Sequence, residues 1–152
     1  MRLTSNASVT KGRRQEMRVL QLTAIVLAAA TAACGGGAPD VSGLRDSFAQ
    51  QVASNKFITD FHRNGDELTF SGPGADGGSA KWRVQIESAV VDPNKDEKQP
   101  YKGTVKSAWY SDGRRIEPKG NRSNLPTELQ ANGISQDCWA FWEKAAGRWS
   151  WE

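Results

Sequence analysis

The chain has 152 residues, of which 20 are Lys or Arg and 17 are Asp or Glu, giving a formal net charge of +3. Five of the basic residues and one acidic residue precede Cys34, so the chain from Cys34 onward holds 15 basic and 16 acidic residues, a net charge of −1. The basicity belongs to the N-terminal segment, and charge therefore gives no support for nucleic-acid binding. The remaining 119 residues are enough for one ordinary domain.

The N-terminal segment contains an apolar stretch from Val19 to Ala33 that follows several basic residues and carries no charge itself. Its 15 residues are fewer than the roughly 20 that a helix needs to span a bilayer. A short apolar core behind basic residues is typical of a secretion signal rather than a membrane span. We therefore predict a signal at residues 1–33.

The end of this segment, Thr31-Ala32-Ala33-Cys34, resembles the lipobox of bacterial lipoproteins. The resemblance implies cleavage before Cys34, acylation of Cys34 with chains such as palmitate, and anchoring to a membrane of the cell envelope, facing the periplasm or the exterior. Two or more acyl chains anchor a protein stably. Thr31 departs from the family, which usually has a large aliphatic residue there, and ordinary cleavage after an Ala-x-Ala sequence is the alternative.

Residues 34–39 are predicted to form a glycine-rich tether, and residues 40–152 a single globular domain. With Cys34 acylated, Cys138 is the only other cysteine, and its neighbours Trp139 and Ala140 favour a buried, inert thiol. Without acylation, a Cys34–Cys138 disulfide becomes possible.

The domain is predicted to begin with a helix from Asp40 to Ser54. Its apolar residues recur at helical spacing, and Pro39-Asp40 is a suitable start signal. The apolar stripe consists of Val41, Leu44, Phe48 and Val52.

From Phe57 the period changes to two, which predicts strands. Phe57, Thr59 and Phe61 would share one face, Asn64-Gly65 would form a hairpin turn, and Leu68 and Phe70 would continue on the return strand. Residues 72–80 are predicted to be a glycine-rich loop. Later strands are expected at Lys81–Val91, with Trp82, Val84, Ile86, Ser88 and Val90 on one face, and at Tyr101–Tyr110, with Tyr101, Val105 and Trp109 on one face.

A charged loop, Asp92–Pro100, should join those two strands, and the second should end in a turn at residues 111–113. Arg114–Gly133 indicates irregular chain with one helical turn near Thr127–Ala131. The end of the chain is predicted to be a hairpin that turns at Lys144–Gly147, with a short helix as the alternative for its first half.

The predicted fold class is therefore α+β, one N-terminal helix followed by an antiparallel β-meander of about five to six strands. This order of elements resembles that of cystatin-like and nuclear-transport-factor-2-like lipoproteins, in which a curved sheet wraps a helix.

Catalytic residues are sparse, and we predict no enzymatic activity, cofactor or metal. His62 is the single histidine, which excludes a two-histidine metal site, and it is expected to be solvated on its strand beside Asp60. The glycine-rich loop lacks the Gly-Lys-Ser/Thr of a phosphate-binding loop and leads into a strand rather than a helix.

The six tryptophans are the most informative feature of the domain. Most are expected in the core, but aromatic side chains also dominate ligand pockets and partner surfaces. Trp142 and Trp151 are the least expected to be wholly buried. The function predicted is a non-catalytic, membrane-anchored accessory or protein-interaction domain, with an envelope protein as partner; a small-molecule carrier or sensor with an aromatic pocket is the alternative. The candidate contact residues are Trp82, Trp109, Trp142 and Trp151.

Overall fold

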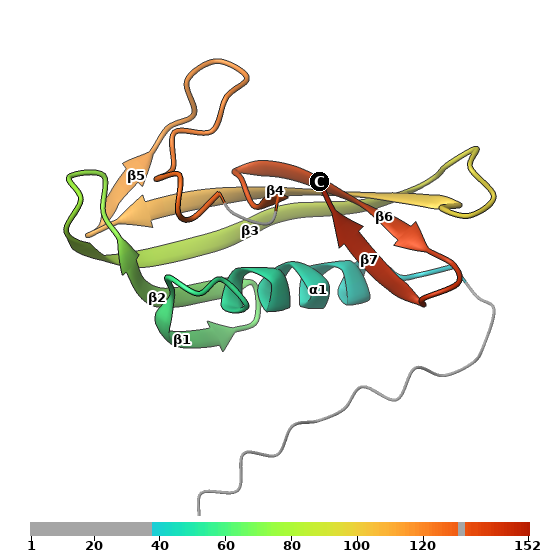
Figure 1. Ribbon diagram of the computed structural model, residues 1–152, viewed down its shortest axis with the longest axis horizontal. Helices are drawn as coiled ribbons and strands as arrows, with labels where there is room; N and C mark the ends of the chain where they lie inside the picture. Colours follow the sequence, from blue (N-terminus) through green and yellow to red (C-terminus); the bar gives the residue numbers. More distant parts are fainter. Residues whose placement is uncertain (1–37, 131–132) are drawn as a thin grey trace, which may run out of the picture. The chain divides into compact units, whose positions relative to one another are not determined.

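A computed structural model describes residues 38–130 and 133–152 of the chain. The described residues belong to one compact unit. The predicted signal, Cys34 and most of the tether lie outside them, as does Ala131 at the end of the predicted helical turn. The described part contains one α-helix followed by seven β-strands (Figure 1). The α+β class is confirmed, with more strands than the five or six expected.

The helix α1 runs from Val41 to Ala53, as predicted from the apolar stripe. Asp40 caps its N-terminus, where the carboxylate accepts a hydrogen bond of 2.7 Å from the Gly43 amide. A side-chain cap of this kind stabilises a helix by about 1 kcal/mol. Leu44, Phe48 and Val52 are fully buried, whereas Val41 in the first turn is exposed.

All neighbouring strands are antiparallel and lie in the order β1-β2-β3-β4-β6-β7. The short β5 pairs with the same edge of β4 as β6 does: β6 pairs with residues 102–106 of β4, and β5 with residues 109–111. Sequential strands thus lie next to each other, as in a meander, except that β5 and β6 share one partner. The strands are β1 (Thr59–Asn64), β2 (Glu67–Pro73), β3 (Ser79–Pro93), β4 (Tyr101–Ser111), β5 (Arg114–Ile116), β6 (Asp137–Glu143) and β7 (Arg148–Trp151).

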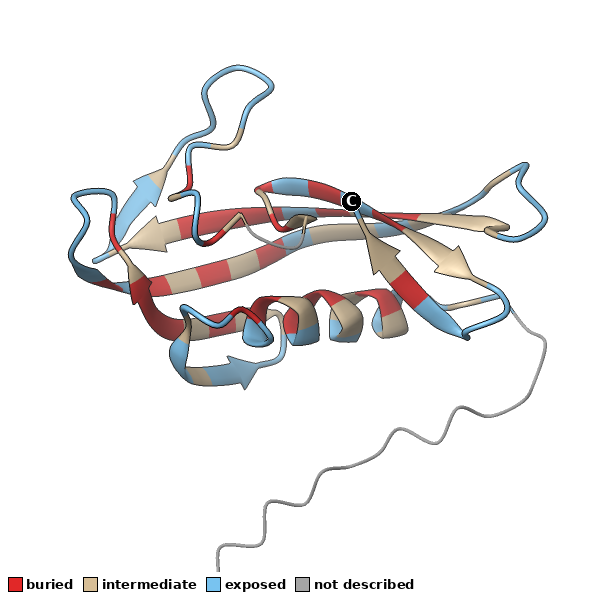
Figure 2. Ribbon diagram, viewed as in Figure 1, coloured by how far each residue is buried: buried red, intermediate tan, exposed pale blue. Residues whose placement is uncertain are grey.

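The core lies between α1 and the sheet face that packs on it, here called the inner face; the opposite side is the outer face. Figure 2 shows the buried side of α1 turned toward β3 and β4. Gly103 of β4 allows this close approach, since a Cβ there would lie 2.5 Å from Leu44 Cδ1 and 3.0 Å from the Trp149 ring.

The predicted alternation along Lys81–Val91 is correct for its first half only. Trp82, Val84 and Ile86 are buried, but the register with β4 shifts between Ile86 and Ser88. A β-bulge inserts one extra residue and therefore exchanges the two faces beyond it. Val90 is consequently exposed, and Ala89 and Val91 pack on the core instead.

A second bulge changes the first predicted strand. The register between β1 and β2 shifts between Thr59 and His62, and Asp60 adopts the left-handed conformation with φ 52°. Phe57, Thr59 and Phe61 therefore do not form one continuous face: Phe57 precedes the strand and is 41% exposed. The hairpin exists, but Asn64 pairs with Glu67, so its turn is Gly65-Asp66 rather than Asn64-Gly65.

The predicted loop at residues 72–80 is too long at both ends. Gly72 and Pro73 continue β2, paired with Ala80 and Ser79 of β3, which leaves only residues 74–78 as the loop. Gly72 has a packing role, because a Cβ there would touch Leu129 at 3.4 Å. The indole nitrogen of Trp82 donates to the Pro73 carbonyl at 3.0 Å and holds the strand end in place.

The C-terminal hairpin is confirmed, with β6 and β7 joined by residues 144–147, and the helical alternative is wrong. The section before it contains β5, a tight turn closed by two backbone hydrogen bonds between Lys119 and Arg122, and a second turn in which the Gln130 amide donates to the Pro126 carbonyl at 3.2 Å. Within the described residues, α1 is too short and too polar to cross a membrane.

Candidate functional site

Two of the four tryptophans proposed as contact residues lie in the middle of the core. Trp82 is 2% exposed and Trp109 is 0% exposed. Their rings contact each other and Phe70, with centroids 6.0 to 6.4 Å apart. These rings stabilise the sheet by burying a large apolar area.

The other two, Trp142 and Trp151, are half-buried on the inner face at the β6–β7 hairpin. The Trp142 ring meets Trp149 edge-on at 5.4 Å, and the Trp151 ring meets Phe48 at 5.7 Å. Trp151 also donates its indole N–H to Ser47 Oγ at 3.0 Å. The four predicted residues therefore divide into a core pair and a hairpin pair rather than forming one site.

Trp139, which was not among the predicted contacts, is the tryptophan that reaches solvent most, at 44% exposed. Its neighbours Cys138 and Ala140 are buried on the inner face, so the strand period of two turns Trp139 to the outer face. That alternation is visible in the sequence and could have identified Trp139. The residue also borders a depression of about 690 Å³ beside the chain that connects β5 to β6.

Trp139 is part of a group on the outer face that spans three strands and is called here the outer patch. In one row, Val90 of β3, Thr104 of β4 and Trp139 of β6 are opposite one another. In the next row, Asp92 of β3, Lys102 of β4 and Phe141 of β6 are opposite one another. The Lys102 ammonium lies 5.3 Å from the centre of the Trp139 ring and 6.0 Å from that of Phe141. The outer patch therefore combines exposed apolar side chains with the ammonium of Lys102, whose cross-strand neighbour on β3 is Asp92.

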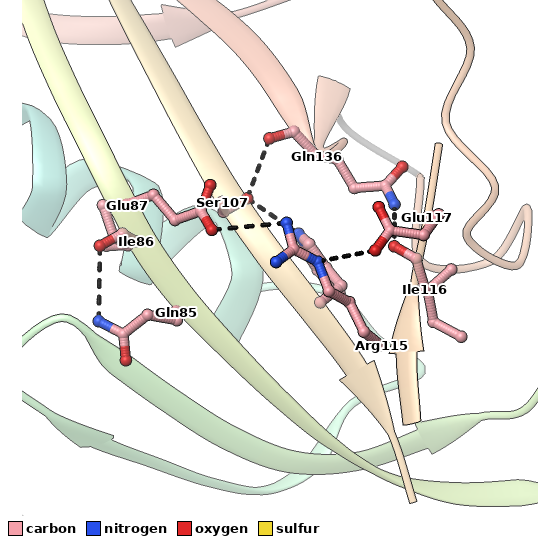
Figure 3. A network of polar contacts seen from close by, with 9 residues as sticks. Gln85, Ile86, Glu87, Ser107, Arg115, Ile116, Glu117 and Gln136 are labelled. Carbon is pink, nitrogen blue, oxygen red and sulfur yellow. Dashed lines mark hydrogen bonds and ion pairs between the residues drawn. The ribbon is translucent and has the colours of Figure 1, made fainter. Parts of the chain in front are cut away.

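A buried network positions the start of β6 (Figure 3). The Gln136 carbonyl accepts hydrogen bonds from the Ser107 amide at 2.8 Å and from the Ser107 hydroxyl at 3.2 Å, and its side-chain amide donates to the Ile116 carbonyl at 2.7 Å. Trp109 Nε1 donates to the same Ser107 hydroxyl at 2.9 Å. Arg115 of β5 adds ion pairs with Glu87 and Glu117 at 3.6 and 3.1 Å. The bonds of Gln136 fix the start of the strand that carries Trp139, whereas the exposed ion pairs of Arg115 join β5 to β3 and to Glu117.

A second group of polar residues lies at the other end of the sheet and is called the polar cluster. Ser71 donates its hydroxyl to Asp60 at 3.1 Å and accepts a hydrogen bond from the Lys81 ammonium at 2.8 Å. The three residues border a depression of about 430 Å³ that His62 also lines. The sequence does not reveal this cluster, because the bulge at Asp60 brings the carboxylate over Ser71.

The polar cluster has the residue types of a nucleophilic site, but its serine hydroxyl is buried. A serine nucleophile needs a neighbouring base that accepts its proton. The Asp60 carboxylate accepts the Ser71 hydroxyl proton and so occupies the place of a base, but Ser71 is only 7% exposed and its oxygen already accepts a hydrogen bond from Lys81. The contacts join β1, β2 and β3 and stabilise the left-handed residue of the bulge. Across the described ranges 38–130 and 133–152, no three His, Cys, Asp or Glu side chains gather as a metal site.

Cys138 is a buried thiol, as predicted. Burial raises its pKa to about 12, because the thiolate would lose its hydration, and nearby Asp137 acts in the same direction. The thiolate is the reactive form of cysteine, so Cys138 is chemically inert in the folded protein.

No protein-family model, curated protein or solved structure matches this chain.

Proposed function

We propose that the chain is a membrane-anchored, non-catalytic lipoprotein of the bacterial cell envelope whose domain acts as an accessory, protein-binding module. Acylated Cys34 would hold the protein at a membrane, and the short glycine-rich tether would leave the domain free to meet a partner. The near-neutral charge of the chain after the signal fits a protein partner better than a nucleic acid.

The outer patch is the observation that carries the proposal. Tryptophan and other aromatic side chains are enriched at the energetically important centres of protein interfaces. Trp139 is exposed, Phe141 is half-buried beside it, and Lys102 places a positive charge over both rings. A partner with an apolar pocket bordered by a carboxylate would complement this arrangement.

A photoreactive phenylalanine analogue placed at residue 139 of the full chain in its bacterial host tests the partner. Phe57 offers a matched control, since it is equally exposed and also lies beneath an ammonium group, Lys56, at 4.9 Å, but belongs to the other end of the molecule. A discrete cross-linked product at position 139 and none at position 57 is expected. Equal products at both positions, or none at 139, would contradict the proposal.

The anchor is tested separately by mass spectrometry of the mature N-terminus. The expected N-terminal residue is a doubly or triply acylated Cys34, and the variant Cys34→Ala should leave the membrane fraction. An unmodified Cys34, or a Cys34→Ala protein that still sediments with membranes, would refute lipidation without bearing on the outer patch.

The non-catalytic role is supported by the polar cluster, in which the buried Ser71 hydroxyl is already bonded to Asp60 and Lys81. The carrier alternative has less support, because Trp82 and Trp109 are buried against each other and Phe70.

A further inference from the structure

The last strand of the sheet, β7, has a free edge whose polar groups can be assigned. β7 pairs only with β6 among the described strands. The Glu152 amide donates to the Trp139 carbonyl at 3.1 Å, and the Gln136 carbonyl is bonded to Ser107 of β4. Residues of an antiparallel strand direct their peptide groups alternately to one side and the other. Arg148, Ser150 and Glu152 therefore face β6, and Trp149 and Trp151 direct their N–H and C=O groups away from the sheet.

We infer that β7 pairs antiparallel with β7 of a second copy of this chain. An edge with unpaired peptide groups is a template for another strand. If Trp149 of one copy lies opposite Trp151 of the second copy, both outward residues of each strand are used, and four backbone hydrogen bonds form around a two-fold axis at Ser150. This inference goes beyond the proposed function and uses the strand edge next to the outer patch, since Ser150 lies opposite Phe141 and the Glu152 amide bonds to Trp139.

Charge favours the same register. When Trp149 lies opposite Trp151 of the second copy, Arg148 lies opposite Glu152 of the second copy, with both side chains on the outer face. Two symmetric pairs of opposite charge result, and such cross-strand pairs are stabilising. In the single chain Arg148 has a highly exposed side chain and only a long contact of 3.4 Å with Glu143. The edge is therefore self-complementary in hydrogen bonds and in charge.

A groove beside β7 gives a second reason for a two-fold partner. It has a volume of about 630 Å³ and lies between β7 and one side of α1. The bond from Trp151 to Ser47 fixes the helix beneath the strand. A two-fold axis perpendicular to the sheet puts both inner faces on the same side, so the two grooves open toward each other. The residues of α1 and its C-cap that line the groove are serines and glutamines, which have small or amide side chains: Ser47, Gln50, Gln51 and the capping Ser54.

Such a helix face suits contact with its own copy. Serine side chains allow two helices to approach closely, and the exposed amide of Gln50 both donates and accepts, so it can pair with Gln50 of the second copy across a two-fold axis. The buried indole N–H of Trp149, which also lines the groove, has no acceptor among the described residues. The second copy would fill a groove that is polar and already shaped.

Disulfide trapping in the full-length protein tests the pairing. Ser150 of each copy would face its counterpart at a position without direct backbone bonds, where the Cα atoms of antiparallel strands are about 4.5 Å apart, a separation that a disulfide can bridge. His62→Cys, on the exposed edge strand β1, is the matched control. We expect Ser150→Cys to form a dimer at least about tenfold faster than His62→Cys under mild oxidation, because pairing raises the effective concentration of the two thiols.

Charge variants decide the register in the same assay. Arg148→Glu should slow the cross-linking of Ser150→Cys, and the exchange of Arg148→Glu with Glu152→Arg should restore it. Circular dichroism checks that each variant is folded. Equal rates for Ser150→Cys and His62→Cys, or failure of the charge exchange to restore the rate, would overturn the inference. A disulfide between Ser150→Cys and a different protein, identified by mass spectrometry, would also overturn it and assign the edge to that protein.

Discussion

The two edges of the sheet are built differently. The β1 edge carries a bulge, a left-handed Asp60 and charged side chains, and is tied down by the 2.7 Å ion pair of Arg63 with Asp46 of α1 and by the bond from Ser71 to Asp60. The β7 strand is regular and contains one charged residue, Arg148, with Glu152 directly after it. Bulges and edge charges discourage strand addition. The β1 edge, called here the closed edge, thus carries several features that discourage strand addition, and the β7 edge, called the open edge, carries fewer of them.

The largest expected difference between the edges is in how firmly each strand is held. Trp149 of β7 is 7% exposed and packs against Trp142, whereas Phe61 of β1 is only half-buried. Trp149→Ala should lower the free energy of unfolding by about 3–5 kcal/mol. Phe61→Ala should lower it by about 1 kcal/mol, because less apolar area is lost. Urea denaturation followed by far-UV circular dichroism measures both, and equal losses would remove this contrast.

At Gly103, β4 lies close to Leu44 of α1 and to the Trp149 ring of β7, so this glycine helps to hold β7 in place. A Cβ added by Gly103→Ala would lie within 3.0 Å of both Leu44 and the Trp149 ring, so the helix or β7 must shift. We expect a loss of about 1–3 kcal/mol in the free energy of unfolding, as for other overpacked cores. Hydrogen exchange should increase in β7 and not in β1. Thr104→Ala, the next residue on the opposite face, is the control and should cost little.

The strand next to the open edge carries the buried Cys138, whose titration gives a pH dependence. The thiol has a pKa of about 12 in the folded protein and 9.0 as its ordinary value, so the folded state keeps the proton that the unfolded state releases. The stabilisation is present below pH 9 and is lost as the pH rises from 9 toward 12, at about 1.4 kcal/mol per pH unit. The slope of unfolding free energy against pH should be shallower in Cys138→Ala; an identical slope would contradict the burial of the thiol.

The smallest expected effect concerns the closed edge and uses two substitutions at one position. Asp60→Ala and Asp60→Gly both lose the hydrogen bond from Ser71, but only alanine keeps the strain of a residue with φ 52°. Left-handed backbone costs a residue other than glycine roughly 1–2 kcal/mol, so Asp60→Gly should be the more stable variant by about that amount. Thermal unfolding of the pair measures the difference. A more stable Asp60→Ala would show that the bulge is unstrained.

The sequence predicts the elements whose signals are local. The apolar stripe from Leu44 to Val52 and the cap at Asp40 define α1, and glycine-containing turns define the first and last hairpins. The class and the order of strands follow from these. The predicted end of the second strand is wrong at Gly72 and Pro73, which are residues typical of loops but continue β2. Leu129 packs against Gly72, and the Trp82 indole donates to the Pro73 carbonyl.

The bulges could not be predicted, and they account for most of what the sequence did not reveal about the sites. Each exchanges the two faces of a strand, so Val90 joins the outer patch and Asp60 joins the polar cluster only in the folded protein. Trp139 is different, since its alternation with Cys138 and Ala140 already places it on the outer face. Trp82 and Trp109 are almost completely buried because β3 and β4 are central strands of the sheet. The position of a strand within the sheet is not visible in a local sequence pattern.

Amide hydrogen exchange of the full-length protein at several concentrations tests the contrast between the edges most directly. The amides of Arg148 and Ser150 should be protected at every concentration because they face β6. Those of Trp149 and Trp151 should exchange rapidly in dilute protein and become protected as the concentration rises, while β1 stays unchanged. Exchange of Trp149 and Trp151 that does not depend on concentration, or protection that appears in β1 instead, would contradict the account.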